Sequence, residues 1–284
     1  MASDHGQLFS MNELPSLTTT GRRTKFDLAY MLIKRDILGR YRGSAMGLLW
    51  SFVVPLMMLG IYTFVFGEIF QARWSGRAAE SGTTSTLDFA LLLFIGLMNH
   101  GFLAECLTRS AGIIIGHANY VKRVVFPLDL LPVMTVMSAL FHFFVSLLVF
   151  TVFYVFVKGN LQPTILYLPL ILAPFVILST GICWFVAGAG VYYRDVIQIM
   201  NLGVTVLLFL SPVLYPASML PEDLLPLFNL NPLTFVIQQS RAVIFLGLSP
   251  DWGGLAIYTG VAFLVAFLGY RSFMAMRKGF ADVL

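Results

Sequence analysis

The sequence predicts an all-α, polytopic membrane protein with six membrane-spanning helices, and three observations lead to that prediction. First, long stretches contain no Asp, Glu, Lys or Arg: 25 residues between Arg42 and Glu68, 28 between Asp129 and Lys158, and 35 between Lys158 and Arg194. Second, 58% of the residues are hydrophobic and only 11% are charged. Third, the stretches have the right length, because a bilayer core of roughly 30 Å needs about 20 apolar residues in a helix and excludes charge.

The first 23 residues are expected to form a disordered tail. The N-terminal 25 residues lack the apolar core of a cleavable signal peptide and contain Asp4, Glu13 and Pro15. Residues 24–42 then show the pattern of an amphipathic helix, because apolar side chains recur at helical spacing and charged ones occupy the other faces. The apolar positions are Phe26, Tyr30, Ile33, Ile37 and Tyr41. Such a helix is expected to lie in the membrane interface, with its apolar stripe at the acyl boundary.

Six spans are expected at about residues 46–70, 87–106, 130–157, 166–191, 196–214 and 255–273. Gly39, Gly43 and Gly47 precede or open the first span at four-residue spacing. This spacing predicts either a helix face that lets another helix approach closely, or a chance arrangement in a glycine-containing segment. Residues 24–284 are therefore expected to form a single membrane domain, with no separate globular domain.

The segment 220–246 before the last span is also apolar, but it is expected to form two short re-entrant helices. Pro226 and Pro232 disfavour a continuous helix, and Arg241 would be costly against lipid. A hairpin that enters and leaves on one side fits these residues better than a seventh crossing, which is the alternative.

Arg241 has two possible roles in that hairpin. It could meet a lipid-linked phosphate, or it could pair with Glu222 or Asp223, and we favour the pairing.

The distribution of basic residues predicts the orientation. Fourteen of the 18 Lys and Arg residues fall in the N-terminal segment, in the loops after the second and fourth spans, and at the C-terminus. The opposite side has only Arg73, Arg77, Lys158 and Arg241. By the positive-inside rule both termini are expected in the cytoplasm. A nucleic-acid partner is not expected, since the basic residues are spread over several loops and do not cluster with aromatic residues.

The motifs of several enzyme classes are missing. The sequence has no phosphate-binding loop, no HExxH, no GxSxG and no clustered metal ligands, so neither a catalytic residue nor a metal site is expected. Acidic residues near mid-span, which ion-coupled carriers usually show, are also missing, because Asp88 and Glu105 lie near span ends. His142 is the one titratable residue deep in a span, and we expect a lone packing histidine. Cys106 and Cys183 are expected to be small buried residues.

The loop 107–129 is the longest expected on the cytoplasmic side between spans. It combines three consecutive isoleucines, a tyrosine and basic residues around residues 113–123. The composition permits an ordinary positively charged loop, or a short helix that docks a cytosolic partner.

Several segments together resemble a known family. The run 32–50, read as LIKRDILGRYRGSAMGLLW and followed by Pro55 and Leu56, resembles the N-terminal signature of type-2 ABC exporter permeases. The match is closest to the branch that exports O-antigen, capsule and teichoic-acid polysaccharides. The likeness continues in order through residues 119–127, 192–196, 211–216 and 231–234. Residues 61–67 look more like O-antigen exporters than capsule exporters.

The resemblance implies a dimer of this chain in the bacterial inner membrane, with both termini cytoplasmic. It implies that a separate cytosolic subunit binds and hydrolyses ATP with Mg²⁺, so this chain holds no cofactor. The exported molecule would be a polyprenyl-pyrophosphate-linked polysaccharide, in a channel lined with aromatic and small polar residues. Export of a drug or lipid on the same scaffold is the competing class, and a scaffold protein or membrane enzyme is a third.

The resemblance also implies three sets of functional residues. The ATPase-docking set is Ile115, His117, Asn119, Tyr120, Lys122 and Arg123; the interface-helix set is Lys34, Arg35, Tyr41 and Arg42; and the exit set is Pro226, Asn231, Pro232, Gln238 and Arg241.

Overall fold

The computed structural model describes residues 23–65, 86–121, 126–215, 221, 223, 228 and 230–284. Every regular element in these ranges is helical. The first half of the chain contains α1 (Arg23–Arg40), the 3₁₀ turn η2 (Gly47–Leu49), α2 (Trp50–Phe64), α4 (Thr86–Ser110), α5 (Ile113–Gly116), α6 (Ala118–Val121) and α7 (Leu130–Lys158). The second half contains η4 (Pro163–Tyr167), α8 (Leu168–Tyr192), α9 (Val196–Phe209), α11 (Pro232–Ile244), α12 (Trp252–Met276), η7 (Arg277–Gly279) and α13 (Phe280–Val283).

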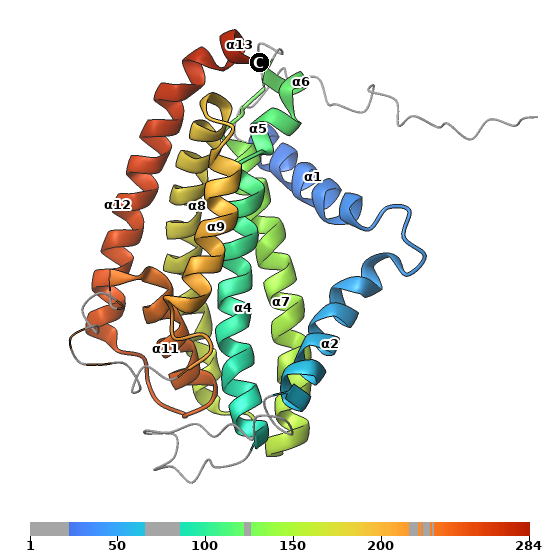
Figure 1. Cartoon of the computed structure of the whole chain (residues 1–284), viewed down its shortest axis with the longest axis vertical. Helices are drawn as coiled ribbons and strands as arrows, with labels where there is room; N and C mark the ends of the chain where they lie inside the picture. The colour runs from blue at the N-terminus through green and yellow to red at the C-terminus, as the bar shows by residue number, and fades with distance from the viewer. Residues whose placement is uncertain are drawn as a thin grey trace, which may run out of the picture.

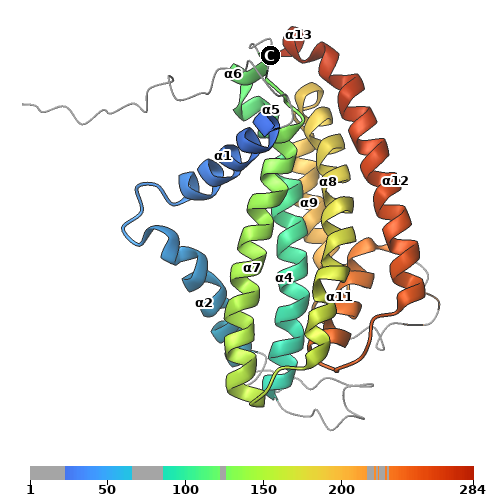
Figure 2. The ribbon, with the colours of Figure 1, turned by 180° about the vertical axis from the view of Figure 1, so that it is seen from behind.

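The long helices form a bundle with α4 near its middle (Figure 1). Helix α4 packs against α7, α8, α9 and α11, while α12 packs along α8 on one flank and α2 packs on α7 on the other. Helices α1 and α2 meet at a turn and project from the bundle as an open angle, as both views show (Figures 1 and 2). We call the end of the bundle that holds α5, α6 and α13 the α1 end, and the opposite end the α11 end.

Five helices in the described residues are long and apolar enough to cross a membrane: Gly47–Phe64, Leu87–Ser110, Leu130–Lys158, Pro163–Tyr192 and Trp252–Val283. They coincide with five of the six expected spans. The remaining one is the 14-residue helix α9, about 21 Å long at 1.5 Å per residue, which is shorter than a bilayer core. The all-helical membrane fold is therefore confirmed, and the count of six spans stays a prediction.

Within the described residues of one chain, the glycine spacing before the first span does not produce a close helix contact, which favours the alternative of a chance arrangement. Gly43 and Gly47 lie in the turn between α1 and α2 with φ angles of 86° and 51°. A Cβ added to Gly39, Gly43 or Gly47 would have no atom within 4 Å. Two of these glycines supply the left-handed backbone that redirects the chain between α1 and α2, because only glycine adopts it without strain.

The close helix contact lies instead between α8 and α12. A Cβ added to Gly269 would meet the carbonyl group of Gly181, and one added to Gly181 would meet the backbone at Ala266. These two buried glycines let the backbones of two spans touch, as small residues commonly do between membrane helices.

Apolar side chains from six elements meet at the α1 end. Leu32 of α1, Ile113 and Ile114 of α5, Leu131 of α7, Val191 of α8, Phe273 of α12 and Phe280 of α13 all belong to one buried cluster. At the α11 end, the Lys158 ammonium lies 2.6 Å from the Asp88 carboxylate, which joins the end of α7 to the start of α4. Asp88 therefore lies at a span end, as expected.

Candidate functional site at the α1 end

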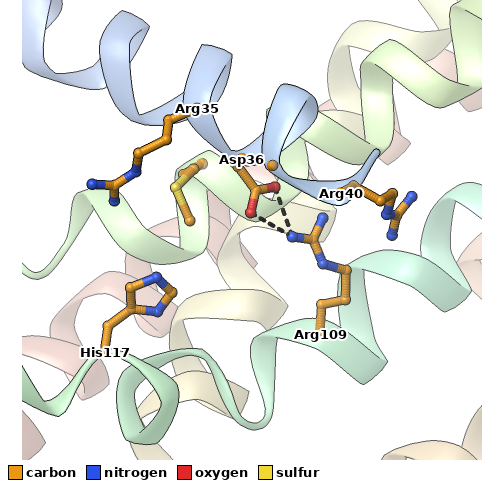
Figure 3. A pocket seen from close by; sticks show the side chains of 7 residues that line it. Arg35, Asp36, Arg40, Arg109 and His117 are labelled. Carbon is orange, nitrogen blue, oxygen red and sulfur yellow. Dashed lines mark hydrogen bonds and ion pairs between the residues drawn. The ribbon is translucent and has the colours of Figure 1, made fainter. Parts of the chain in front are cut away.

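An ion pair fastens α1 to the end of α4. Arg109 donates hydrogen bonds of 2.7 and 2.6 Å to the two carboxylate oxygens of Asp36. Arg109 lies in the last turn of α4, and Asp36 lies on α1 (Figure 3). The side chains are only 25% and 16% exposed. A single guanidinium nitrogen, Nη2, donates to both carboxylate oxygens, so this charge-assisted contact attaches α1 to the end of α4 at one point.

Glu105 extends this pair into a cluster of five charged or titratable residues. It accepts a hydrogen bond from Arg109 at 3.2 Å, one helical turn away, and pairs with Arg40 of α1 at 2.8 Å. The Nδ1 atom of His142 on α7 lies 3.1 Å from each carboxylate oxygen of Glu105. We call Asp36, Arg40, Glu105, Arg109 and His142 the charged cluster. It joins α1, α4 and α7.

His142 is therefore not the lone packing histidine that the sequence suggested. Besides Glu105, its Nδ1 lies 2.8 Å from the Arg40 guanidinium, and its Nε2 lies 3.2 Å from the Tyr41 hydroxyl. With the proton on Nδ1 the ring donates to Glu105, and with the proton on Nε2 the ring accepts from Arg40. In either tautomer the ring connects α7 to the end of α1, because Arg40 is the last residue of α1 and Tyr41 follows it directly.

A cavity of about 430 Å³ lies beside the cluster. Its lining residues come from three helices and one loop position: Arg35, Asp36, Gly39 and Arg40 of α1, Arg109 of α4, Met134 of α7, and His117, which follows α5. In Figure 3, Arg35 and His117 lie on one side of the Asp36–Arg109 pair and Arg40 lies on the other. The cavity thus has three guanidinium groups and one carboxylate on its walls.

The loop between α4 and α7 packs against the bundle along most of its described length. Ile113 and Ile114 are buried. The rings of His117, Tyr120 and Phe126 stack in order, with centroid distances of 5.7 and 4.4 Å. The guanidinium of Arg35 lies 5.7 Å from the centre of the Tyr120 ring, a cation–π contact that ties α1 to this loop.

The expected docking residues thus differ in how accessible the structure leaves them. Asn119 is exposed and Ile115 is half-buried, whereas His117 and Tyr120 are committed to the ring stack. Lys122 and Arg123 lie outside the described residues. Docking by this set stays a prediction, and within it Asn119 is the freest described position.

The interface-helix residues divide in the same way. Lys34, Arg35 and Arg42 are exposed, and Tyr41 contacts His142. The apolar residues Phe26 and Tyr30 of α1 are 74% and 66% exposed. Ile33 packs against the buried cluster at the α1 end and Tyr41 contacts His142, so Phe26 and Tyr30 are the residues of the predicted stripe left most exposed toward the acyl boundary.

The predicted exit segment contains one described helix, α11. Asn231 caps it by accepting a hydrogen bond from the Leu233 amide, Pro232 occupies its first turn, and Gln238 is half-buried. The Asn231 amide also donates to the Leu210 carbonyl, so α11 begins beside the end of α9. Pro226 lies outside the described residues. The re-entrant path is therefore described only in its second half.

Arg241 is buried and donates to three backbone carbonyls: Leu92 of α4 at 3.0 Å, Pro212 at 2.6 Å and Val213 at 2.8 Å. Asp223 is exposed and Glu222 lies outside the described residues, so the favoured pairing with an acidic residue stays a prediction. The contacts with carbonyl groups could not be predicted from the sequence, because every residue has a backbone carbonyl and the residue type does not indicate which one an arginine will contact. They clamp α11 to α4 and to the turn that ends α9.

Sequence reasoning also missed Asp36, Glu105, Arg109 and His142 as a set. One signal was present, since Glu105 and Arg109 are four residues apart at the end of a span and form an i,i+4 pair. Their partners are far away in the sequence, and no local pattern predicts them.

Comparison with known proteins identifies the broader class. Residues 28–245 match the family described as "ABC-2 type transporter". An O-antigen export system permease protein RfbA of Klebsiella pneumoniae is 28% identical over 263 residues, which cover 91% of this chain and 95% of that protein. The RfbA protein of Myxococcus xanthus is 23% identical and covers 90% and 94%. The polysialic acid transport protein KpsM of Escherichia coli is 24% identical and covers 85% and 91%.

Proposed function

Because the chain belongs to the ABC-2 type transporter family, we propose that it is the transmembrane subunit of an ATP-driven exporter of lipid-linked polysaccharide. The exported molecule is a polyprenyl-pyrophosphate-linked glycan that crosses the bacterial inner membrane. Within that class, we assign it as lipopolysaccharide O-antigen. The observation that carries this proposal is the full-length likeness to proteins named for O-antigen export, which extends over nine-tenths of the chain.

The division of labour follows from the sequence and the family. This chain lacks a phosphate-binding loop, so a separate cytosolic subunit supplies ATP hydrolysis with Mg²⁺, and two copies of this chain enclose the path. The α1 end is the cytoplasmic one, because it carries most of the basic residues. The charged cluster then lies where motion of the ATPase first reaches the membrane helices. Helix α1 contributes residues to the cluster, and His117, between α5 and α6, lines the cavity beside it.

Deletion of the gene followed by complementation tests the proposal. Cells without the chain should lose surface O-antigen and accumulate lipid-linked glycan inside, and the wild-type gene should restore export. Normal surface O-antigen in the deletion strain would contradict the proposal. The purified chain alone should not hydrolyse ATP, and hydrolysis should appear only when the partner subunit is added.

Capsule export is the second candidate, favoured by the likeness to the polysialic acid transport protein. The same deletion strain distinguishes the two, because loss of capsule with intact O-antigen would assign the chain to capsule export.

A further inference from the structure

The cavity beside the charged cluster has the size and chemistry of an anion site. Its volume of about 430 Å³ lies within the roughly 300–1,000 Å³ typical of small-molecule pockets. Three arginines and one aspartate line it. Guanidinium groups match the geometry of phosphate oxygens and bind them in bidentate fashion.

The three arginines are not equivalent. Arg109 is held by Asp36, and Arg40 is held by Glu105. Among the described residues, no carboxylate lies within ion-pair distance of Arg35, whose described contact is the face of the Tyr120 ring. Arg35 is exposed, lines the cavity and keeps its hydrogen-bond donors available. The Asp36 carboxylate also lines the cavity, but its charge is offset by Nη2 of Arg109, which donates to both of its oxygens.

The position of the cavity narrows the ligand class. It opens between α1, whose exposed Phe26 and Tyr30 suit the acyl boundary, and the α4–α7 loop at the same end of the bundle. If α1 lies in the membrane interface, as the sequence predicts, the cavity lies at the depth of the lipid headgroup phosphates. Gly39 leaves the α1 wall open, since a Cβ at this position would have no atom within 4 Å.

We propose that this cavity binds the phosphate headgroup of a membrane lipid, with Arg35 as the principal donor. Two lipids carry that chemistry: the diphosphate of the glycan carrier and the phosphodiester of a bulk anionic phospholipid. The first source rests on the proposed function, and the second does not. In either case the phosphate binds beside α1 and beside the charged cluster that anchors it.

Binding of labelled farnesyl diphosphate to the purified full-length chain in detergent tests this site. Arg35→Gln should weaken binding about 10- to 100-fold, as the loss of a charge-assisted bond to phosphate implies. Gly39→Leu should also weaken it, because it fills the cavity without changing any charge. Lys25→Gln, which removes an exposed charge from the same helix outside the cavity, should bind as the wild type does. Unchanged affinity in both Arg35→Gln and Gly39→Leu would overturn the proposal.

Competition separates the two lipid sources. Stronger competition by unlabelled farnesyl diphosphate than by phosphatidylglycerol supports the glycan carrier, and equal competition supports a bulk phospholipid. Farnesol, which lacks phosphate, should not compete, and competition by farnesol would show that the prenyl chain alone binds and would refute a phosphate site. These binding measurements do not depend on export. A negative binding result, together with O-antigen export that requires the chain in cells, would refute the phosphate site and leave the proposed function intact. The proposed function itself would be refuted by normal surface O-antigen in the deletion strain.

Discussion

Replacing Asp36 with Asn should loosen α1 from the bundle by a measurable amount. The substitution keeps the shape of the side chain and removes the charge that accepts two hydrogen bonds from Arg109 at 2.6 and 2.7 Å. A hydrogen bond to a charged group contributes about 1.5–3 kcal/mol when shielded. Because the two side chains are 16% and 25% exposed, solvent screening reduces that figure. We expect a loss of about 1–3 kcal/mol in the free energy of unfolding.

A double-mutant cycle isolates the pair. Asp36→Asn, Arg109→Gln and the double variant are unfolded reversibly in mixed micelles, and the coupling energy is taken from the four free energies. We expect a coupling of about 1–2 kcal/mol, because either single change already removes the contact between the two charged groups. A control cycle pairs Asp36→Asn with Arg271→Gln, an exposed position on α12, and should be additive within about 0.5 kcal/mol.

The result has a functional counterpart. If the pair transmits motion to α4, Asp36→Asn should lower glycan export while the partner's ATP hydrolysis continues. A coupling energy below about 0.5 kcal/mol, equal to that of the control cycle, would refute the reasoning. It would mean that the other contacts of α1, among them the Arg40–Glu105 ion pair and the buried Leu32, hold α1 without the Asp36–Arg109 pair.

Three further predictions concern other parts of the chain. Gly269→Ala should lower the melting temperature of the purified chain sharply, because its methyl group meets the backbone of α8, whereas Gly260→Ala on the same helix faces open space and should be tolerated. Arg241→Gln should destabilise the chain by about 2–4 kcal/mol, since buried carbonyls of three residues lose a charged donor, and Arg271→Gln serves as its exposed control. Asn119→Trp, at the exposed position of the predicted ATPase-docking set, should reduce co-purification of the ATPase subunit while the melting temperature of the chain stays unchanged. Unchanged co-purification would argue against docking at this position.

The spans could be predicted from the sequence because one physical rule dominates them. Lipid excludes charge, so the runs between Arg42 and Glu68 and between Asp129 and Lys158 mark helices without any knowledge of packing. Five expected spans match long apolar helices for this reason. The glycine pattern at residues 39–47 misled because four-residue spacing says nothing about whether the backbone is helical there, and φ is positive at Gly43 and Gly47.

The functional clusters could not be predicted in the same way. Asp36 and Arg109 are 73 positions apart, and Glu105 and His142 are 37 apart. Their pairing depends on how α1 folds back toward the bundle, which a local pattern does not encode. The sequence did place Glu105 and His142 in neighbouring spans as unusual polar residues, and the structure supplies the reason, since the two side chains lie within hydrogen-bond distance of each other.

Helix α4 connects the charged cluster at the α1 end to the contacts that Arg241 makes toward the α11 end. At one end of α4, Glu105 and Arg109 hold α1; toward the other end, the carbonyl of Leu92 accepts from Arg241 of α11. Leu92 and Glu105 are 13 positions apart in one continuous helix, about 20 Å at 1.5 Å per residue. If α4 moves nearly as a rigid body, we expect a shift of α1 at Glu105 to displace the turn at Pro212 and Val213 through Arg241. Under the proposed function, the buried Arg241 would then lie where a movement that begins at the ATPase subunit reaches the opposite end of the bundle.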